Sequence, residues 1–530
     1  MPNYTSKVPF YTYPDTLPEQ EAALASNPLL QRMVACRSNY DGDQHRPLYH
    51  YVNPEGGLND PNGLCHWQGQ WHLFYQGYPP EDPRQHWGHA VSDDLIHWRD
   101  LPYAIYPDPE ECCFSGSTLA EEDRVIAIYH GTKAGTMVAT SDDPLLLNWE
   151  KLTGGPVIPM AGPGDPPLPY TVFDPCIWKK DGAYYSLSAG TQRTGPGGKH
   201  MRADYLLRST DLVTWEYLHP FVDDDHYTLV GDDGACPYFW PIGDSHHMLL
   251  FFSHMSGGQY LIGDYDRGRD KLVVTDGGLF NFGAAHPSGV HAPSATPNAD
   301  GSITAIFNMN PGLDTDNWNQ IMTLPRRLSL DANAELRVAP AGDVASLRGE
   351  HRRIGPLPLP ANQETVLDGI GGSAIEIEAS IDTKGAAMVE LDVLRTPNRE
   401  EVTRICFYRD AGFDNRFYGA RQFSNESLSR RVYESRRDSL ISVDNSYSST
   451  LPGAKPRAPE TAPVFVAPDE PLELRVFVDR SVVEVFVGDR QCVALRVYPG
   501  REDAVGVSLR AQGAAAQLQS LDAWQMGSIY

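Results

Sequence analysis

Cysteine is scarce in this sequence, with 8 residues among 530. None of them forms the Cys-X-X-Cys pair that zinc fingers combine with two histidines, so a structural zinc site is not predicted. Cysteines spread this thinly through a long chain are typical of reduced thiols that behave as small buried hydrophobic residues. We therefore expect neither a metal centre nor a bound cofactor.

Long apolar runs are also missing. No stretch approaches the roughly 20 apolar residues that a membrane-spanning helix needs. The N-terminus shows no basic segment followed by an apolar one, which is the pattern of a secretory signal. A cytoplasmic protein is therefore the default prediction, and secretion with a signal already removed stays open.

Basic residues are outnumbered by acidic ones. Lys and Arg total 43 against 69 Asp and Glu, which gives a net charge of −26. A surface of this sign repels nucleic acid and anionic membranes, so neither is an expected partner. It suits a small uncharged ligand better than a polyphosphate.

Glycine and proline are plentiful, at 47 and 43 residues, and indicate a turn-rich all-β protein. A phrase of Ser, acidic residues and a closing Trp recurs at 92–98, 141–149 and 209–215, each time after a strand-like segment. The Trp residues are about 50–65 positions apart, a period typical of propellers and other repeat folds. We therefore predict a β-propeller over 47–330, with this acidic turn at one corner of each blade.

The rest of the chain divides by composition. Residues 1–46 are predicted to form an N-terminal arm with a helical patch at 17–36. The Pro-rich segment 331–365 reads as a linker. Strict apolar–polar alternation over 366–530 predicts a β-sandwich of jelly-roll type, although 411–462, rich in Arg, Asp, Ser and Pro, looks like a long loop.

Asp60 lies in a run of turn-forming residues, 59–63, between segments of strand type at 50–54 and 71–76. An Asp fixed by the following Pro is expected at the rim of a sheet, with its carboxylate facing a cleft. The alternative is an Asx-turn, in which the carboxylate bonds its own backbone. The five residues alone do not separate the two.

A propeller channel that receives one acid from each blade can supply the groups that cleave a glycosidic bond. One carboxylate acts as nucleophile and one carboxylic acid as proton donor, and a separation of about 5–5.5 Å implies retention of configuration. A third carboxylate can stabilise the transition state. Asp60 and Asp174, which also precedes a Pro, are candidates. The third is expected near 234–239, where the chain offers Asp232 and Asp233 but no Glu.

Several motifs, in the right order, resemble glycoside hydrolase family 32, the invertase, inulinase and levanase family. The segment 59–63 resembles its nucleophile motif, 114–117 its Phe-Ser-Gly-Ser motif, 174–175 its Arg-Asp-Pro motif and 236–237 its Glu-Cys-Pro motif. The hairpin at 477–486 is similar to a signature of its second domain. The resemblance implies a five-bladed β-propeller joined to a β-sandwich.

The resemblance also implies roles for individual residues. Asp60 would be the nucleophile and Asp174 the transition-state stabiliser. Trp87 would offer an apolar face to the sugar, and amide side chains would bond its hydroxyls. The substrate subsite implied in this way consists of Asn59, Gln76, Trp87, Phe114, Ser115 and Phe173.

The chain departs from the family pattern in four places, and in one of them Gly57-Leu58 stands where the family has Trp-Met. Ala235 stands where the acid/base Glu is expected and cannot donate a proton. Phe173 replaces an Arg, and Tyr238 replaces an Asp. Three explanations for Ala235 are open. It is an engineered Glu→Ala change, or a natural loss after which Asp233 or the substrate supplies the proton. In the third explanation the protein has become a sugar-binding protein without catalytic activity. The retention of both Asp60 and Asp174 argues against the third explanation.

The function expected from these residues is that of a retaining β-fructofuranosidase acting on sucrose or short fructans, by hydrolysis or fructosyl transfer. The alternative is a catalytically impaired fructoside-binding pseudoenzyme. The partner in either case is a small carbohydrate. His130, at the end of a strand, is a candidate subsite residue. Glu484, within an apolar strand, is expected to point outward to solvent.

Overall fold

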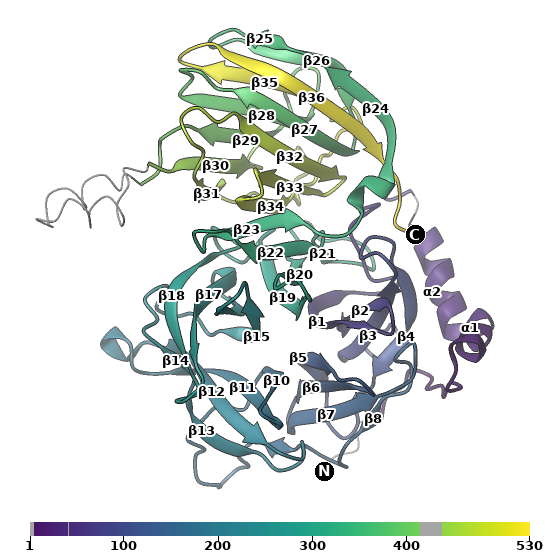
Figure 1. Ribbon diagram of the computed structural model, residues 1–530. Coiled ribbons are helices and arrows are strands. Elements are labelled where there is room, and N and C mark those ends of the chain that lie inside the picture. The colour runs from purple at the N-terminus through teal and green to yellow at the C-terminus, as the bar shows by residue number, and fades with distance from the viewer. Residues whose placement is uncertain (1–4, 41, 414–436) are drawn as a thin grey trace, which may run out of the picture.

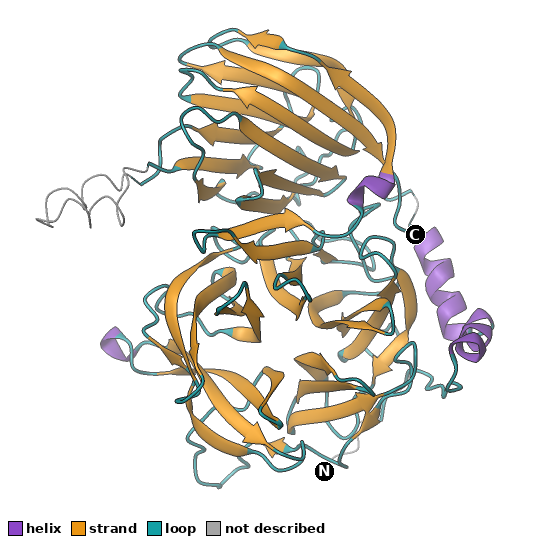
Figure 2. Ribbon diagram, viewed as in Figure 1, coloured by secondary structure: helices purple, strands orange, loops and turns teal. Residues whose placement is uncertain are grey.

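The computed structural model describes residues 5–40, 42–413 and 437–530 and shows two β domains stacked one on the other (Figure 1). Within these residues the strands form seven sheets, five in the first domain and two in the second. Figure 2 shows how little of the chain is helical. The predicted all-β fold, a five-bladed β-propeller followed by a β-sandwich, is confirmed.

Each blade is an antiparallel sheet whose strands follow one another in the chain. Blade one contains β1 (Leu58–Trp67), β2 (Gln70–Gly77), β3 (His86–Ser92) and β4 (Arg99–Ile105). Blade two contains β5 (Cys113–Ala120), β6 (Val125–Gly131), β7 (Gly135–Ser141) and β8 (Glu150–Lys151), with β9 (Ile158–Pro159) beside β7. Blade three contains β10 (Pro175–Lys180), β11 (Ala183–Gln192), β12 (Met201–Ser209) and β13 (Glu216–Pro220).

The last two blades each gain a short extra strand. Blade four contains β15 (Ala235–Ile242), β16 (His246–Ser253), β17 (Gly257–Asp266) and β18 (Lys271–Leu279), with β14 (Val222–Asp223) parallel to β18. Blade five contains β19 (Val290–Pro297), β20 (Ile303–Met309), β22 (Arg326–Leu330) and β23 (Leu336–Pro340), with β21 (Ile321–Met322) beside β20. The first strands of neighbouring blades contact one another around the ring, and β19 contacts β1 to close it.

The recurring Ser–Asp phrase forms the turn between the third and fourth strands of blades one to three. Asp94, Asp143 and Asp211 each accept a hydrogen bond of 3.1 Å from the Ser two residues before. The same carboxylates also accept backbone N–H groups a few residues ahead. A short acidic side chain that bonds its own backbone fixes such a turn. The phrase is therefore a corner of these blades.

The segment expected to be a turn, 59–63, lies inside strand β1, and 50–54, expected to be a strand, is not one. The register between β1 and β2 shifts twice, between Leu58 and Pro61 and between Asn62 and Cys65. A β-bulge accommodates residues that do not fit a regular ladder and re-aims a side chain. The Pro and Gly of this segment thus break the register of the strand without ending it.

The sandwich packs two sheets face to face around one apolar core. One sheet has the order β24-β36-β27-β32-β33-β34, with β25 beside β36, and the other the order β26-β35-β28-β29-β30-β31. The bounds are β24 (Arg348–Ile354), β25 (Leu357–Leu359), β26 (Glu364–Gly371), β27 (Ala374–Asp382), β28 (Met388–Arg395), β29 (Thr403–Tyr408), β30 (Ser439–Asp444), β31 (Glu460–Val464), β32 (Leu472–Asp479), β33 (Val482–Val487), β34 (Gln491–Arg496), β35 (Gly506–Gln512) and β36 (Ala516–Met526).

Two expectations about this half of the chain were wrong. The segment 331–365 is not a linker, because it contains β23 of the propeller, a 3₁₀ turn (Val344–Leu347) and strands β24 and β25 of the sandwich. Pro358 lies in the short strand β25, which pairs only with β36 among the described strands and tolerates a missing N–H. The expected loop 411–462 contains strands β30 and β31, and its residues 414–436 lie outside the described part of the chain.

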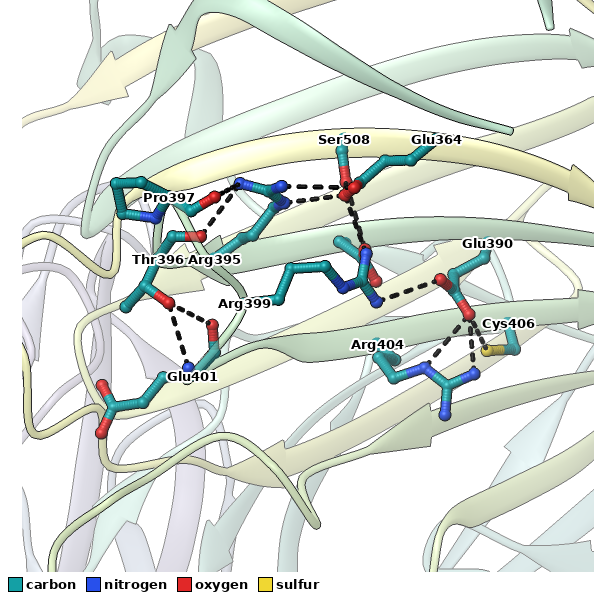
Figure 3. Close-up of polar contacts among 11 residues, drawn as sticks. Glu364, Glu390, Arg395, Thr396, Pro397, Arg399, Glu401, Arg404, Cys406 and Ser508 are labelled. Carbon is teal, nitrogen blue, oxygen red and sulfur yellow. Dashed lines mark hydrogen bonds and ion pairs between the residues drawn. The ribbon is translucent and has the colours of Figure 1, made fainter. Parts of the chain in front are cut away.

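The outer face of the second sandwich sheet carries a network of arginines and carboxylates (Figure 3). Alternation on β28 sends Val389 and Leu391 into the core and Glu390 and Asp392 to this face. Arg399 contacts Asp392 directly and Glu390 at 3.4 Å. Burial, and then the charge of Glu390, raise the pKa of Asp392 to about 6. The positive charges of the arginines therefore offset the repulsion among several carboxylates that are buried on this side of the sheet.

Glu484 is not exposed as expected but fully buried between the two domains. Its carboxylate binds Arg326 of the propeller at 2.8 Å and accepts the backbone N–H of Leu324 at 2.7 Å. His50 lies between two sandwich acids, with Nε2 3.1 Å from Glu484 and Nδ1 2.9 Å from Asp479. Alternation correctly turns Glu484 away from the core of its own domain, but the propeller covers that face. The interface is therefore held by buried ion pairs.

Helices α1 (Leu17–Ala25) and α2 (Pro28–Ser38) belong to the N-terminal arm, and α2 contacts β4 at the outer edge of blade one. Asn27 caps α2 by accepting the N–H groups of residues 29 and 30, each at 3.0 Å. In the described part of the chain neither helix is long and apolar enough to cross a membrane.

Candidate active site

Each of the five blades brings one polar side chain to the same point on the propeller axis. They are Asp60 on β1, Ser115 on β5, Asp174 directly before β10, Cys236 on β15 and His291 on β19. Asp60 is in contact with the side chains from blades two, four and five, and Cys236 joins it to Asp174. The sequence predicted Asp60, Ser115 and Asp174 for this site, and the ring closure brings them together.

Asp60 is held by one oxygen and free at the other. Its Oδ2 accepts hydrogen bonds from Ser115 Oγ at 2.8 Å and Gln76 Nε2 at 3.3 Å, with Cys236 Sγ at 3.5 Å. Its Oδ1 has no hydrogen-bond partner among the described residues and lies 3.6 Å from His291 Nδ1. Burial opposes ionisation, but His291 and these donors outweigh it and lower the pKa of Asp60. The carboxylate is thus ionised and oriented, and one of its oxygens is buried without a hydrogen-bond partner among the described residues.

Asp174 has the opposite electrostatic setting. Its Oδ2 accepts the backbone N–H of Cys236 at 3.2 Å, and its Oδ1 has no partner among the described residues. Burial, and then the negative charge of Asp60, raise the pKa of Asp174 to about 7. Near neutral pH it is present both as acid and as carboxylate, so it can either donate to or accept from a sugar hydroxyl. Two carboxyls with separated pKa values suit different roles.

Cys236 was not predicted as a site residue, and its backbone explains its position. Its φ of 49° lies in the left-handed region, which costs a non-glycine residue about 1–2 kcal/mol. The register between β15 and β16 shifts at the same place, between Ala235 and Tyr238. This bulge turns the N–H of Cys236 toward Asp174 and its thiol toward both acids. Strain of this kind concentrates at functional sites.

Ala235 is fully buried beside Cys236. It packs in one apolar cluster with Phe252 and Ala292, and Phe173 packs against the edge of that cluster. An aliphatic side chain therefore fills the place where the resemblance implied a carboxylic acid.

Amide side chains surround the mouth of the site. Asn59 Oδ1 accepts hydrogen bonds from Asn308 Nδ2 and Gln320 Nε2, both at 3.1 Å. Burial raises the pKa of Tyr78, and a hydrogen bond with the Asn59 side chain opposes this rise, so Asn59 also has a partner in Tyr78. Gln76 Nε2 bonds Ser115 Oγ at 2.6 Å as well as Asp60, so these two side chains fix its position.

Trp87 does not present a face to a ligand. Its side chain has 0% exposure, and its Nε1 donates to the Phe114 carbonyl at 2.9 Å. It packs against Phe74 and Tyr129, with ring centroids 5.7 and 5.6 Å away. The expected contact with the sugar is wrong in this structure, because the neighbouring blade covers the ring. Trp87 instead supports the wall that carries Phe114 and Ser115.

Phe114 and Phe173 form a half-buried aromatic wall with His130 between them. The His130 ring centroid lies 6.1 Å from that of Phe114 and 5.2 Å from that of Phe173. Burial lowers the pKa of His130 to about 4, so the imidazole is neutral at physiological pH. The replacement of an Arg by Phe173 therefore goes with an uncharged surface on this side of the site.

Tyr238, which replaces an expected Asp, connects neighbouring blades through its hydroxyl group. Its hydroxyl donates to the Gly116 carbonyl and contacts Ser294 Oγ, both at 2.9 Å, and accepts the Gly63 N–H at 3.1 Å. Four blades are joined by this one oxygen. His291, Asn308 and Gln320 were also missed by the sequence analysis. The available signal was their position in the last blade, which has to contact β1 to close the ring.

A cavity of about 890 Å³ lies elsewhere, between helix α2, residues 97–100 and the C-terminal residues 528–530. It shares no residue with the cluster on the axis. The cluster of Asp60 and Asp174 therefore does not lie in this cavity.

Comparisons with known proteins agree with this arrangement. The model of the glycosyl hydrolases family 32 N-terminal domain matches residues 50–340, and that of the family 32 C terminal matches residues 343–525. The chain is 28% identical to the levanase of Bacillus subtilis (strain 168), over 92% of this chain and 71% of that protein. It is 27% identical to the sucrose-6-phosphate hydrolase of Escherichia coli, over 92% of this chain and 96% of that protein.

Solved structures show the same fold. The crystal structure of fructan 1-exohydrolase IIa from Cichorium intybus superposes with a TM-score of 0.75 and 21% identity, over 92% of this chain and 98% of that chain. Because the two family models together match most of the sequence, this chain belongs to glycosyl hydrolase family 32 and is a glycoside hydrolase.

Proposed function

We propose that the protein is a retaining β-fructosidase that acts on sucrose or short fructans and passes the fructosyl group to water or to a second sugar. The observation that carries this proposal is the setting of Asp60, which is ionised, fixed through Oδ2 and left without a hydrogen-bond partner among the described residues at its buried Oδ1. The proposal is supported by relatives named levanase, sucrose-6-phosphate hydrolase and fructan 6-exohydrolase.

In the first step Asp60 Oδ1 attacks the anomeric carbon of the fructosyl unit. The new bond forms a covalent fructosyl-enzyme as the glycosidic bond breaks, and the leaving oxygen takes up a proton. In the second step water or a sugar hydroxyl attacks the same carbon, releases Asp60 and gives up its proton. Two inversions at one carbon retain the configuration.

Asp174 stabilises the positive charge that develops on the ring. Its free Oδ1 and the Asn59 amide are the groups that would bond the ring hydroxyls. Interactions that strengthen as charge develops lower the barrier more than uniform binding does. The neutral wall of Phe114 and Phe173 offers apolar surface to the C–H side of the sugar.

The competing proposal is a fructoside-binding protein without turnover, and the single observation that favours it is Ala235. Calorimetry on the unmodified protein separates the two when run beside a turnover assay. A binding protein takes up sucrose, kestose, inulin or levan and releases no fructose and no transfer product. An enzyme consumes at least one of them.

The test of Asp60 uses an aryl β-fructofuranoside, whose leaving group needs little protonation. We expect Asp60→Asn to lower turnover by at least about 10³-fold, because it removes the nucleophilic oxygen and keeps the shape. Asp181→Asn is the matched control, since Asp181 is an exposed acid paired with Arg267. Unchanged turnover in Asp60→Asn removes Asp60 from the mechanism.

A further inference from the structure

Two titratable residues flank the position of the missing acid. Ala235 pairs in register with Phe252 across strands β15 and β16. Asp233 lies two residues before Ala235, and His254 lies two residues after Phe252. The pairing therefore places both at the same end of these two strands, beside the vacated position.

Asp233 and His254 are joined by two hydrogen bonds. His254 Nδ1 lies 2.5 Å from Asp233 Oδ2, and the backbone N–H of His254 donates to Asp233 Oδ1 at 3.2 Å. The hydrogen bond at Nδ1 thus fixes the orientation of the imidazole. Among the described residues no group bonds its Nε2, and the side chain is 60% exposed. An imidazole that is hydrogen-bonded at Nδ1 and solvent-exposed, with no protein partner at Nε2 among the described residues, can donate a proton from Nε2.

The pair lies next to the reacting groups. The His254 ring centroid is 6.1 Å from that of His291, whose Nδ1 is 3.6 Å from Asp60 Oδ1. It is 4.9 Å from the ring of Phe252, which packs against Ala235. His254 is therefore close to the nucleophile without contacting it, on the solvent side of position 235.

The surrounding charges favour the imidazolium form. The hydrogen bond that His254 donates to Asp233 raises the pKa of His254, burial lowers it, and the negative charges of Asp233, Asp60 and Asp174 raise it, with a net increase. His286 and His291 face the same space from blade five. They are the groups that oppose a positive charge there, and three carboxylates outweigh them.

We infer that His254, held by Asp233, is the proton donor that takes over the role of the absent carboxylic acid at position 235. This inference rests on the proposed β-fructosidase function. As Asp60 Oδ1 bonds to the anomeric carbon, the glycosidic C–O bond breaks and its electron pair goes to the leaving oxygen, which takes the proton from His254 Nε2. In the second step neutral Nε2 accepts a proton from the attacking water, whose oxygen bonds to the carbon as the bond to Asp60 breaks.

The experiment compares sucrose, which has a poor leaving group, with 4-nitrophenyl β-fructofuranoside, which has a good one. We expect His254→Gln and Asp233→Asn to lower kcat on sucrose by about 10²–10⁴-fold, the usual size of general acid catalysis. Formation of the fructosyl-enzyme from the aryl substrate, measured as the nitrophenol burst rate, should fall less than about tenfold. His246→Gln is the matched control, because His246 begins β16, the strand that ends directly before His254, and pairs with Asp264 at 3.1 Å.

A second readout separates a donor from a structural role. The rate on sucrose should fall as pH rises through the pKa of His254, and this limb should vanish in His254→Gln. His291→Asn should slow both substrates alike, because His291 contacts Asp60 and not the leaving group. Equal losses on both substrates in His254→Gln, or no loss on sucrose, overturn the inference. A burst in the unmodified protein that Asp60→Asn abolishes, with no turnover of sucrose, also overturns it and leaves the proposed nucleophile intact. No reaction with any fructoside overturns the proposed function instead.

Discussion

Replacing Glu484 by Leu should strongly destabilise the join between the two domains. Glu484 and Arg326 are both fully buried, and their contact of 2.8 Å is the only ion pair of Arg326 among the described residues. Without the carboxylate, a guanidinium with two nitrogens already unpartnered in the described structure stays in a dry interface. The Leu324 N–H and His50 Nε2 lose their acceptor at the same time.

The size of the effect follows from this geometry. Removing one member of a buried ion pair costs about 3–5 kcal/mol, because the other charge is left uncompensated. The same cost is expected for Arg326→Met. Replacing both partners by apolar residues removes both desolvation penalties, so the double variant should lose much less than the sum of the two single changes. A coupling of about 3 kcal/mol is a large part of a typical stability of about 5–15 kcal/mol.

The assay is equilibrium urea unfolding of the four proteins in the cycle, followed by far-ultraviolet circular dichroism and by tryptophan fluorescence. Glu378→Ala serves as control, because Glu378 is a partly exposed acid that pairs with Arg348 and should cost about 1 kcal/mol or less. Single variants that each lose less than about 1 kcal/mol would refute the reasoning. So would losses that simply add in the double variant.

Three further predictions concern titrating or paired groups. The folded state holds the proton of Asp174 more tightly than the unfolded chain, with a pKa of about 7, so stability falls as pH rises from about 4 to about 7. Asp174→Asn should therefore raise the melting temperature more at pH 8 than at pH 5, and equal shifts would contradict this. Burial lowers the pKa of His50, but the hydrogen bonds of His50 to two carboxylates outweigh burial, so the pKa in the folded state is raised. The stabilisation that protonated His50 contributes is therefore complete below about pH 6.5 and is lost as pH rises through the folded pKa. His50→Gln should then lose more stability at pH 6 than at pH 9 by urea unfolding, and the reverse order would contradict it. Arg399→Met removes a cation shared by three sandwich carboxylates and should cost about 2 kcal/mol, since its side chain is partly exposed; a urea midpoint equal to that of the unmodified protein would show that the network carries no net stability.

The sequence revealed the features that depend on short stretches of chain. Each Ser–Asp turn is closed by hydrogen bonds within five residues of Asp94, Asp143 or Asp211, so its pattern repeats in the sequence as it does in the blades. Strand alternation over the sandwich is equally local, because its period of two follows from the backbone. Both signals indicated a propeller and a sandwich before any long-range contact was known.

The sequence predicted the environment of a residue less well where a neighbouring blade or domain covers that residue. Alternation showed that Glu484 leaves the core of its own sheet, but it contains no information about the propeller that covers the other face. Trp87 was expected to touch the sugar, and the packing of blade two buries it instead. In both cases the deciding contact lies far away in the chain.

The site itself divides along the same line. By itself the sequence determined which acids are available, Asp60 and Asp174, and that position 235 carries no acid, because residue identity alone decides those facts. Only the tertiary structure decided that Cys236 joins the two acids and that His254 reaches the same space as Asp233. The physical reason is that the propeller closes through contacts between β19 and β1, more than 200 residues apart in the chain, and no local pattern encodes which side chains such a closure brings together.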